Sequence, residues 1–355
     1  MGWKSKIRKS LLDLQVVGGY ADKVMANESF LDCALGTNPF GTPEGVKKKL
    51  KKLDIDLSKY PDVHYNILKE ELVNYWEGAV KEDDLFICNG SMGCFEKVNK
   101  FTIQDGTRIL GVSPQYPRYV SDATALGAIY ESIKLKEEEY FEIKVDEIIN
   151  SLDRKYTLLY LDNPHNPTGQ FLRLKEITEI VDEAEKKGIL VLVDEAYEDF
   201  VEKKESAVNL NYNNLIVIRS FSKGLGLASM RIGYAVIKNP ELCELYKKVD
   251  LPFPVSRISE ILAVEALKDF KFVRNTRKMI AQIKQKIMSA LKKEFFISKT
   301  HPTTPIFLLW GKEDTYQYFL RRGILTVSGS AFGLNNSYVR IRIPREADEF
   351  LRRLS

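Results

Sequence analysis

The sequence predicts an α/β protein with a large domain, built on a mostly parallel sheet flanked by helices, and a smaller α+β domain. Short apolar runs alternate with helical segments between about residues 85 and 218, which is typical of a parallel sheet covered on both faces. Polar residues follow several of these runs, at the strand ends where such sheets bind ligands. Beyond residue 240 the pattern changes to helical segments and then to mixed short strands.

The elements expected in the large domain are short. A lysine-rich amphipathic helix is expected over 43–53 and another helix over 67–76. Strands are expected over 85–88, 108–112, 129–135, 156–161, 189–193 and 215–218. One helix is expected to open at Gly90, and another to span 174–187 and end at Gly188, since glycine readily adopts the left-handed conformation of a helix cap.

Three parts of the chain are expected. Residues 1–45 form an N-terminal segment belonging to the small domain, and residues 46–240 form the large domain. Residues 241–355 hold a helical connection and the C-terminal small domain, with helix-forming sequence over 241–293 and strands over 306–310 and 338–343.

Composition excludes several classes of protein. The 355 residues carry a formal net charge of only +4, without the dense basic and aromatic tract of a nucleic-acid-binding protein. Four cysteines without CxxC spacing and three histidines argue against a metal site. The basic start, Met1 to Ser10, leads into no apolar segment, and no apolar run is long enough to span a bilayer. We therefore expect a cytoplasmic protein with no metal ion and no nucleic-acid or membrane partner.

The segment from Arg219 to Tyr234 carries the most reactive side chain. It follows the apolar run 215–218 and contains Ser220, Ser222, Lys223 and Arg231. A lysine at such a strand end becomes a nucleophile when desolvation or a nearby cation removes its proton. The serines and the arginine suit an anion.

Other strand ends supply complementary groups. Asn166 follows one predicted strand and Asp194 ends the next, while Ser91 and Met92 open a helix whose free N–H groups favour an anion. This set suits pyridoxal 5'-phosphate. Its ring nitrogen needs a carboxylate, its aldehyde needs an amine, and its phosphate needs N–H groups, hydroxyls and an arginine.

Each signal alone has a plainer interpretation. Asp194 could cap a helix, and the two Asn-Pro pairs at 163–167 could simply be turns. Ser220 and Lys223 also match the S-x-x-K motif of serine β-lactamases and penicillin-binding proteins, which would make Ser220 the nucleophile. That family also needs S-D-N and K-T-G, whereas here Ser-Asp-Ala at 121–123 precedes the lysine and Lys-Thr at 299–300 is followed by histidine. A regulator that kept the fold and lost the chemistry is another alternative, which the intact lysine opposes.

Three motifs in order resemble those of one family. They are Asn-Pro-His-Asn-Pro-Thr-Gly at 163–169, Asp-Glu-Ala-Tyr at 194–197, and the segment 220–233. They resemble fold-type I pyridoxal-phosphate enzymes, in the class I/II aminotransferase branch that holds histidinol-phosphate aminotransferase and threonine-phosphate decarboxylase. The resemblance extends from about Leu35 to Ile343. It implies the type I fold, with the cofactor bound in the large domain, and an aminotransferase of amino acid biosynthesis.

The implied reaction moves an amino group between an amino acid, or an amino-acid-like amine, and a 2-oxo acid through a Lys223 aldimine. The alternative is decarboxylation of an amino acid phosphate. In the resemblance Lys223 also moves the proton, Asp194 pairs with the ring nitrogen, and Asn166 and Tyr197 bond the ring oxygen. Lys223, Asp194 and Tyr197 are the implied catalytic residues, and Tyr116 stacks on the ring.

The resemblance further implies a phosphate site and a homodimer with active sites at the interface. The phosphate contacts would be Ser91, Met92, Ser220, Ser222 and Arg231. Tyr60 would reach the neighbouring subunit's phosphate, although Tyr65 is close enough in sequence to take that role instead.

Substrate contacts are implied at both ends of the chain. Strand alternation puts Arg340 and Arg342 on one face, and the resemblance favours Arg340 as the clamp on the substrate carboxylate. Arg342 would be a surface residue or a second anion contact, and Asn38 would close over the substrate from the small domain.

One departure concerns the substrate. Histidinol-phosphate aminotransferases usually carry an arginine where residues 323–327 have Thr326 and Val327. Because that arginine helps bind the substrate's phosphate, the sequence leaves open whether the substrate is phosphorylated. Arg118, Arg257 and Lys312 are the cations that could substitute.

Overall fold

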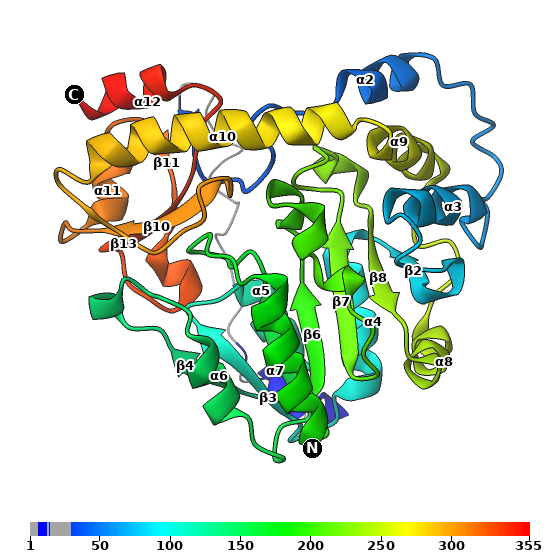
Figure 1. Cartoon of the computed structure of the whole chain (residues 1–355). Helices are drawn as coiled ribbons and strands as arrows, with labels where there is room; N and C mark the ends of the chain where they lie inside the picture. The colour runs from blue at the N-terminus through cyan, green and yellow to red at the C-terminus, as the bar shows by residue number, and fades with distance from the viewer. Residues whose placement is uncertain (1–5, 13, 15–29) are drawn as a thin grey trace.

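The large sheet has seven strands and is parallel except for one. A computed structural model describes residues 6–12, 14 and 30–355. The strand order is β2 (Leu85–Cys88), β8 (Gly233–Ile237), β7 (Leu215–Ser220), β6 (Leu190–Asp194), β5 (Leu158–Asp162), β3 (Arg108–Ser113) and β4 (Ile129–Lys134). Strand β8 runs antiparallel to both of its neighbours, β2 and β7. The predicted α/β class with a mostly parallel sheet is confirmed (Figure 1).

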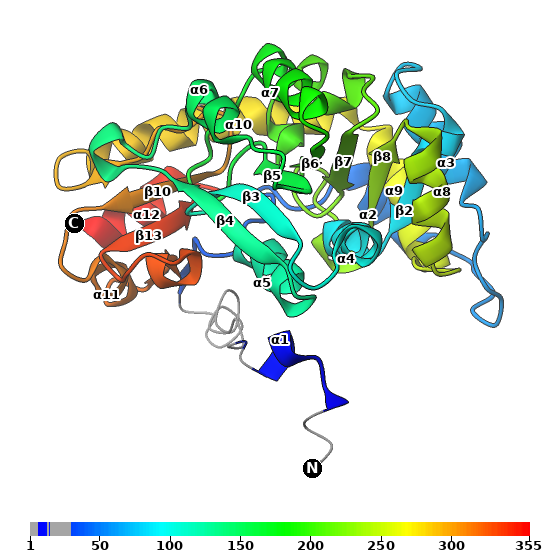
Figure 2. The same ribbon diagram turned by 90° about the horizontal axis from the view of Figure 1, so that it is seen from below.

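The central strands are apolar because helices cover both faces of the sheet. Strands β2, β5, β7 and β8 are buried along their whole length, as expected for a doubly covered sheet. Helices α6 (Val145–Ser151) and α7 (Leu174–Lys186) lie on one face, and α4 (Gly90–Thr102) and α5 (Pro117–Ala125) lie on the other (Figure 2). Alternate side chains of β5 therefore enter two different cores, with Leu159 facing α7 and Leu158 facing α4.

Further helices pack around the edge of this domain. Helices α2 (Glu44–Lys51) and α3 (Asn66–Tyr75) contact α9 (Arg257–Leu267), and α8 (Pro240–Val249) contacts α4. The short helix α1 (Lys9–Leu12) contacts α5. Helix α10 (Phe270–Leu291) then runs along the molecule from the α9 side to the second sheet (Figure 1).

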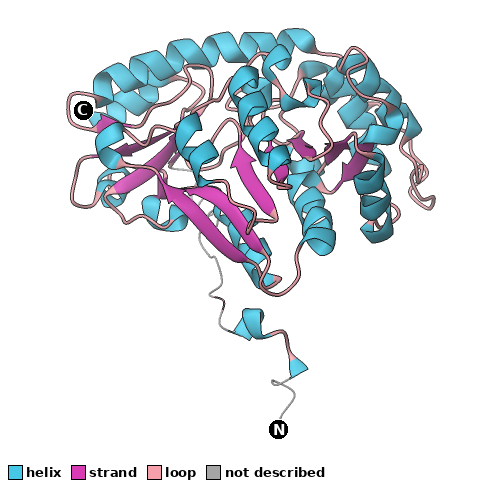
Figure 3. Ribbon diagram, turned by 60° about the horizontal axis from the view of Figure 1, so that its bottom comes forward, coloured by secondary structure: helices cyan, strands magenta, loops and turns pink. Residues whose placement is uncertain are grey.

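A smaller, antiparallel sheet forms the second region. Its order is β12 (Val327–Ser328), β13 (Tyr338–Arg342), β10 (Ile306–Trp310) and β9 (Phe296–Ile297). Helices α10, α11 (Thr315–Leu320) and α12 (Ala347–Leu354) accompany it, and Figure 3 shows its strands beside the large sheet. A separate pair joins β1 (Leu31–Asp32) in parallel to β11 (Ile324–Leu325), so segments about 290 residues apart in the sequence meet here.

Several elements differ from the predictions. Strand β8 and helices α5 and α6 were not expected, and the helix-forming stretch 241–293 is divided into α8, α9 and α10. The predicted division of the chain stays a prediction. The β1–β11 pairing supports assigning the N-terminal segment to the small domain, although residues 1–5, 13 and 15–29 of that segment lie outside the described residues. Helices α8 and α9, beyond the expected boundary at 240, pack on the large domain.

Three further findings concern the described residues as a whole. None of their helices is long and apolar enough to cross a membrane. They also contain no cluster of three or more histidine, cysteine, aspartate or glutamate side chains that could hold a metal ion. All four cysteines are buried free thiols.

Candidate active site

A pocket lies where β5, β6 and β7 end. These neighbouring parallel strands terminate in Asp162, Asp194 and Ser220, and Asp162 is the register partner of Asp194. The pocket has an empty volume of about 420 Å³. It is lined by Ser91, Tyr116, Asp162, Pro164, Asn166, Asp194, Ala196, Tyr197 and Lys223. Polar residues that are distant in the sequence thus meet because parallel strands present their carboxyl ends at one edge.

Asp194 is buried at the end of β6. Its Oδ1 accepts a hydrogen bond from the Ala196 N–H at 2.9 Å, and its Oδ2 accepts one from the Tyr160 hydroxyl at 3.2 Å. Burial, with a further contribution from the negative charge of Asp162, raises the pKa of the Asp194 carboxyl to about 7. The raised pKa means that ionising the Asp194 carboxyl costs free energy, and a cation placed against the carboxylate would offset that cost.

Tyr197 and Lys223 lie together on another side of the pocket. The Lys223 Nζ is 5.4 Å from the centre of the Tyr197 ring. The Tyr197 hydroxyl is buried and has no hydrogen-bond partner among the residues described. A buried hydroxyl of this kind fits a polar atom of a bound group, because native structures rarely leave one unsatisfied.

Gly36 is a site residue that the sequence analysis missed. A Cβ at this position would overlap the Tyr197 hydroxyl and lie 3.5 Å from the Lys223 Nζ. The N-terminal segment therefore passes directly over both side chains, and only glycine leaves them room. The sequence offered no specific signal, since Leu-Gly-Thr at 35–37 looks like an ordinary turn.

Arg340 reaches the pocket from the small sheet. It is fully buried on β13, its Nη1 donates to the Asn166 Oδ1 at 3.0 Å, and its Nη2 donates to the Ala34 carbonyl. The Asn166 N–H in turn donates to Asp162 Oδ2 at 2.8 Å. A guanidinium is thereby fixed beside the amide predicted to bond the ring oxygen.

Arg342 is not a surface residue, and that interpretation is wrong. It is only 6% exposed, and its Nη2 pairs with Asp32 Oδ2 at 2.6 Å. The same side chain donates to the carbonyls of Asp32, Leu35 and Ile343. Arg342 therefore ties β13 to the N-terminal segment, and its charge is already neutralised.

The predicted phosphate contacts gather at the start of α4. Arg231 Nη1 donates to the Ser222 Oγ at 3.2 Å, and the Ser222 N–H donates to the Ser220 Oγ at 3.1 Å. A Cβ on Gly90, which has a φ of +67°, would lie 2.6 Å from Arg231 Nη2. Ser91 and Met92 follow Gly90 in the first turn of the helix, where unpaired N–H groups favour an anion.

Several predicted residues lie outside the pocket lining. They are Met92, Ser220, Ser222, Arg231 and Arg340, and also Asn38, Tyr60 and Tyr65. Asn38 is buried, its Nδ2 donates to the Gly224 carbonyl at 2.8 Å, and its Oδ1 accepts from the Phe40 N–H at 2.9 Å. Tyr60 is 81% exposed and stacks on Phe253. Tyr65 is buried, and its hydroxyl donates to the Val255 carbonyl and accepts from the Val255 N–H.

The three cations considered for binding a substrate phosphate, Arg118, Arg257 and Lys312, do not line the pocket. Arg257 pairs with Glu260 at 2.7 Å, and Lys312 pairs with Glu294 at 2.9 Å. Arg118 is exposed on the first turn of α5, two residues after Tyr116.

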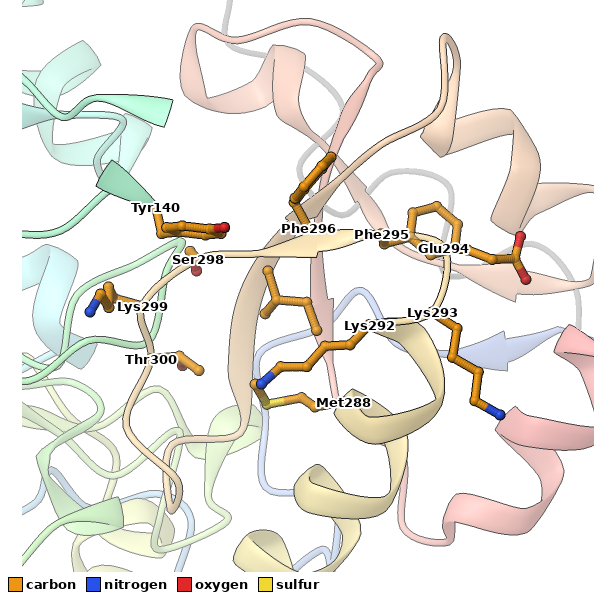
Figure 4. Close-up of a pocket in the computed structure, with 11 residues that line it drawn as sticks. Tyr140, Met288, Lys292, Lys293, Glu294, Phe295, Phe296, Ser298, Lys299 and Thr300 are labelled. Carbon is orange, nitrogen blue, oxygen red and sulfur yellow. The ribbon is translucent and has the colours of Figure 1, made fainter. Parts of the chain in front are cut away.

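A larger groove lies away from these residues. It borders β9 and the end of α10, has an empty volume of about 1290 Å³, and contains no residue of the predicted site (Figure 4). It is an open surface feature lined by lysines and aromatic side chains, including Lys292, Lys293, Phe296, Lys299 and Tyr140.

Comparison with known proteins identifies the family of the chain. Residues 29–354 match the aminotransferase class I and II family. The chain is 32% identical over 320 residues to a histidinol-phosphate aminotransferase of Listeria innocua, covering 88% of this chain and 86% of that protein. It is 30% identical to the enzyme of the same name from Listeria welshimeri, covering 98% and 97%.

Solved structures share the fold. Histidinol-phosphate aminotransferase from Sinorhizobium meliloti, in complex with pyridoxal-5'-phosphate, has a TM-score of 0.84 at 21% identity, covering 99% of this chain and 96% of that one. Aspartate aminotransferase from Thermus thermophilus with maleate has a TM-score of 0.82 at 17% identity, covering 98% and 97%.

The chain therefore belongs to the class I and II aminotransferases, with the type I fold. The protein is a pyridoxal-phosphate-dependent aminotransferase, similar to the histidinol-phosphate branch. This assignment excludes the β-lactamase and regulator interpretations, and it favours transamination over decarboxylation. The pocket fits the cofactor, because it offers an amine, buried carboxylates, the unsatisfied Tyr197 hydroxyl and an anion site at α4.

Proposed function

We propose that the pocket at the ends of β5, β6 and β7 holds pyridoxal 5'-phosphate and exchanges an amino group between an amino acid and a 2-oxo acid. The observation that carries this proposal is the convergence of Lys223, Asp194, Tyr197 and Asn166 on one pocket. When bound, the cofactor withdraws electrons from the substrate Cα.

The protein's residues divide the remaining tasks. Lys223 Nζ binds the cofactor's aldehyde and then carries the proton to and from the substrate Cα. Asp194 holds the ring nitrogen as a cation, and the Asn166 amide and Tyr197 hydroxyl bond the ring oxygen. Tyr116, at the start of α5, covers a face of the ring. The phosphate lies against Ser91 and Met92, with Ser220, Ser222 and Arg231, where the helix dipole and the arginine share its charge.

Arg340 binds the carboxylate of the substrate. The amino donor therefore carries a carboxylate at this position and not a phosphate. Arg342 is neutralised by Asp32, and the register neighbour of Arg340 on β12 is the apolar Val327. One guanidinium matches a carboxylate of charge −1, whereas a phosphate carries about −1.5 to −2 near neutral pH. Histidinol phosphate, the substrate class in the relatives' names, has a phosphate and no carboxylate. Asn38 holds the Gly224 turn beside Lys223 and closes over the substrate.

The active form is a homodimer in the cytoplasm. Tyr60 stacks on Phe253 at 4.6 Å, and both side chains are exposed. Apolar residues close to them in the sequence are exposed as well, namely Leu57, Val63, Ile67 and Leu251. Exposed apolar side chains near one another favour a protein interface. Tyr60 rather than Tyr65 reaches the partner's phosphate, because both hydrogen-bonding capacities of the Tyr65 hydroxyl are used within its own chain. The four unpaired thiols fit the reducing cytoplasm.

Borohydride reduction of the cofactor-loaded protein, followed by peptide mapping, tests the assignment of Lys223. We expect a single stable label on Lys223, and label on another lysine would overturn the proposal. A panel of donors then tests the substrate. Amino acids should change the absorbance of the bound cofactor, and histidinol phosphate at the same concentration should not. A change in cofactor absorbance with histidinol phosphate would contradict the proposed substrate class. Release of carbon dioxide from the amino donor would contradict the proposed reaction.

A further inference from the structure

Asp162 is a pocket carboxylate to which the proposed function gives no task. It ends β5 as Asp194 ends β6, and the two residues are register partners in adjacent parallel strands. Side chains at matched positions of neighbouring strands point to the same face. Both aspartates line the pocket, and both are buried. The sequence analysis passed over Asp162 because it precedes Asn163-Pro164 and looks like part of a turn.

The hydrogen bonds of Asp162 connect it to residues on two sides of the pocket. Its Oδ1 accepts from Gln115 Nε2 at 2.8 Å, and its Oδ2 accepts from the Asn166 N–H at 2.8 Å. The backbone of Tyr116 contributes a further hydrogen bond. Asp162 thus fixes the segments that carry Tyr116 and Asn166.

These partners bring no positive charge. His165 lies 3.9 Å away, but its nitrogens bond Thr168 and the Pro114 carbonyl, and burial lowers its pKa to about 3. The side chains that donate hydrogen bonds to the two aspartates, Gln115 and Tyr160, are both uncharged. Lys223 lowers the pKa of Asp194, but its effect is smaller than the rise caused by Asp162.

Two adjacent buried carboxylates whose side-chain hydrogen-bond donors are uncharged form an incomplete electrostatic site. Burial raises the pKa of Asp162, like that of Asp194, to about 7. A cation at the mouth of this pair allows both to ionise, because attraction in a buried site greatly exceeds that in water. The cofactor's protonated ring nitrogen, placed against Asp194, is such a cation.

We infer that Asp162 is a positioning residue of the cofactor site, whose negative charge acts with that of Asp194 to hold the ring nitrogen in its protonated form. The inference rests on the proposed placing of the cofactor between Lys223 and Asp194. It deepens the function, because a protonated ring is the form that accepts electrons from the substrate.

The test measures binding to the apoprotein of pyridoxal 5'-phosphate and of its deaza analogue, in which carbon replaces the ring nitrogen. The ratio of the two dissociation constants reports the preference for a ring that can be protonated. Asp162→Asn should lower this preference about tenfold, the effect of one unit charge several ångströms away in a partly buried site. An unchanged preference would overturn the inference.

A matched control separates charge from hydrogen bonding. Gln115→Met removes a hydrogen-bond donor to Asp162 without removing a charge. It should weaken both ligands by a similar factor and leave the preference intact. If Gln115→Met lowers the preference as much as Asp162→Asn does, Asp162 acts only through the packing of its loops, and the inference fails.

Asp194→Asn provides a second test that leaves the hydrogen bonds of Asp162 in place. This variant should keep a residual preference of about tenfold, supplied by Asp162, and only the Asp162→Asn/Asp194→Asn double variant should lose it. No residual preference in Asp194→Asn would sink the inference. If Asp194→Asn instead binds both ligands as the unmodified protein does, the proposed placing of the cofactor itself is wrong.

Discussion

Two groups of buried carboxylates meet at the end of β6, and only one of them surrounds an arginine. Asp162 and Asp194 face the pocket and receive hydrogen bonds from uncharged donors. The next residue, Glu195, belongs instead to a cluster with Glu198 and Asp199. These three carboxylates surround the Arg219 guanidinium, which contacts Glu195 at 3.2 Å and Asp199 at 2.7 Å and also pairs with Glu198.

The difference shows which group is structural and which awaits a ligand. Arg219 stacks over Trp76 and has an exposed fraction of only 3%, so its cluster carries its own cation inside the fold. The pocket pair has comparable burial, but the side chains that donate hydrogen bonds to it, Gln115 and Tyr160, are uncharged. Successive residues of extended backbone point in opposite directions, so Asp194, the last residue of β6, and Glu195, the residue after it, enter different surroundings.

Removing the built-in cation should have the largest effect. Arg219→Met leaves three buried carboxylates without their guanidinium, and breaking a buried ion pair costs about 3–5 kcal/mol. The free energy of unfolding of the apoprotein in urea measures this loss. Lys247→Met, which breaks an exposed pair with Glu244, is the control and should unfold like the unmodified protein. Equal stability of the two variants would contradict a structural role for the Arg219 cluster.

The matching change in the pocket should act on the cofactor instead. Asp194→Asn removes the proposed partner of the ring nitrogen and should weaken cofactor binding by about 2–5 kcal/mol, as losses of buried charge pairs do. Titration of the apoprotein with pyridoxal 5'-phosphate measures it. The apoprotein should remain folded, since Arg219 keeps its three carboxylate partners. A dissociation constant within about threefold of the unmodified value would argue against this assignment.

The pH dependence of the free energy of unfolding should report whether the Asp194 carboxyl is protonated or ionised in the folded apoprotein. Burial, and then the negative charge of Asp162, raise the pKa of the Asp194 carboxyl to about 7 in the folded apoprotein, while Tyr160 and Lys223 lower it by less. Its ordinary pKa is 3.8, so the folded state binds more protons than the unfolded state between about pH 4 and pH 7. This carboxyl therefore makes apoprotein stability fall as the pH rises through that range.

Urea unfolding at about pH 5 and about pH 8 tests this expectation. Asp194→Asn apoprotein should lose less stability over that range than unmodified apoprotein, by more than about 1 kcal/mol. Glu195, whose pKa burial raises to about 8, adds its own dependence to both proteins and cancels in the comparison. Parallel curves for the two proteins would show that Asp194 is already ionised in the folded apoprotein.

The smallest effect is expected from an uncharged partner of the pair. Tyr160→Phe removes the 3.2 Å hydrogen bond to Asp194 and should weaken cofactor binding by about 0.5–1.5 kcal/mol. Tyr119→Phe is its control, because the Tyr119 ring stacks on Tyr160 and its hydroxyl has no partner among the described residues. If both variants bind the cofactor equally well, the hydroxyl of Tyr160 does not support Asp194.

Much of the site follows from local sequence, because parallel strands bring their ends together whatever loops connect them. Apolar runs closed by Asp194 and Ser220 predicted both the strands and the edge that carries the pocket. Strand β8 was missed, since the segment from Arg231 to Tyr234 was interpreted only as a binding loop. Strand β8 also lies antiparallel between β2 and β7, and a local sequence pattern does not show which strands pair with each other.

The environment of single residues was harder to predict. Alternation correctly placed Arg340 and Arg342 on one face, but it cannot say what covers that face. The covering groups are Ala34 and Asp32, about three hundred positions earlier in the chain. Asp162 was missed for the same reason, because its importance comes from the neighbouring strand and not from the turn that follows it.

Contact between residues 31–34 and the C-terminal strands sets the order in which the site can be assembled during synthesis. The large sheet is complete once β8 has emerged, and N-terminal parts of a protein generally fold first on the ribosome. The β1–β11 pairing and the contacts of Arg340 with Ala34 and Asn166 must wait for about a hundred further residues. A nascent chain can therefore present the Lys223 edge of the sheet well before it holds the arginine that selects a substrate.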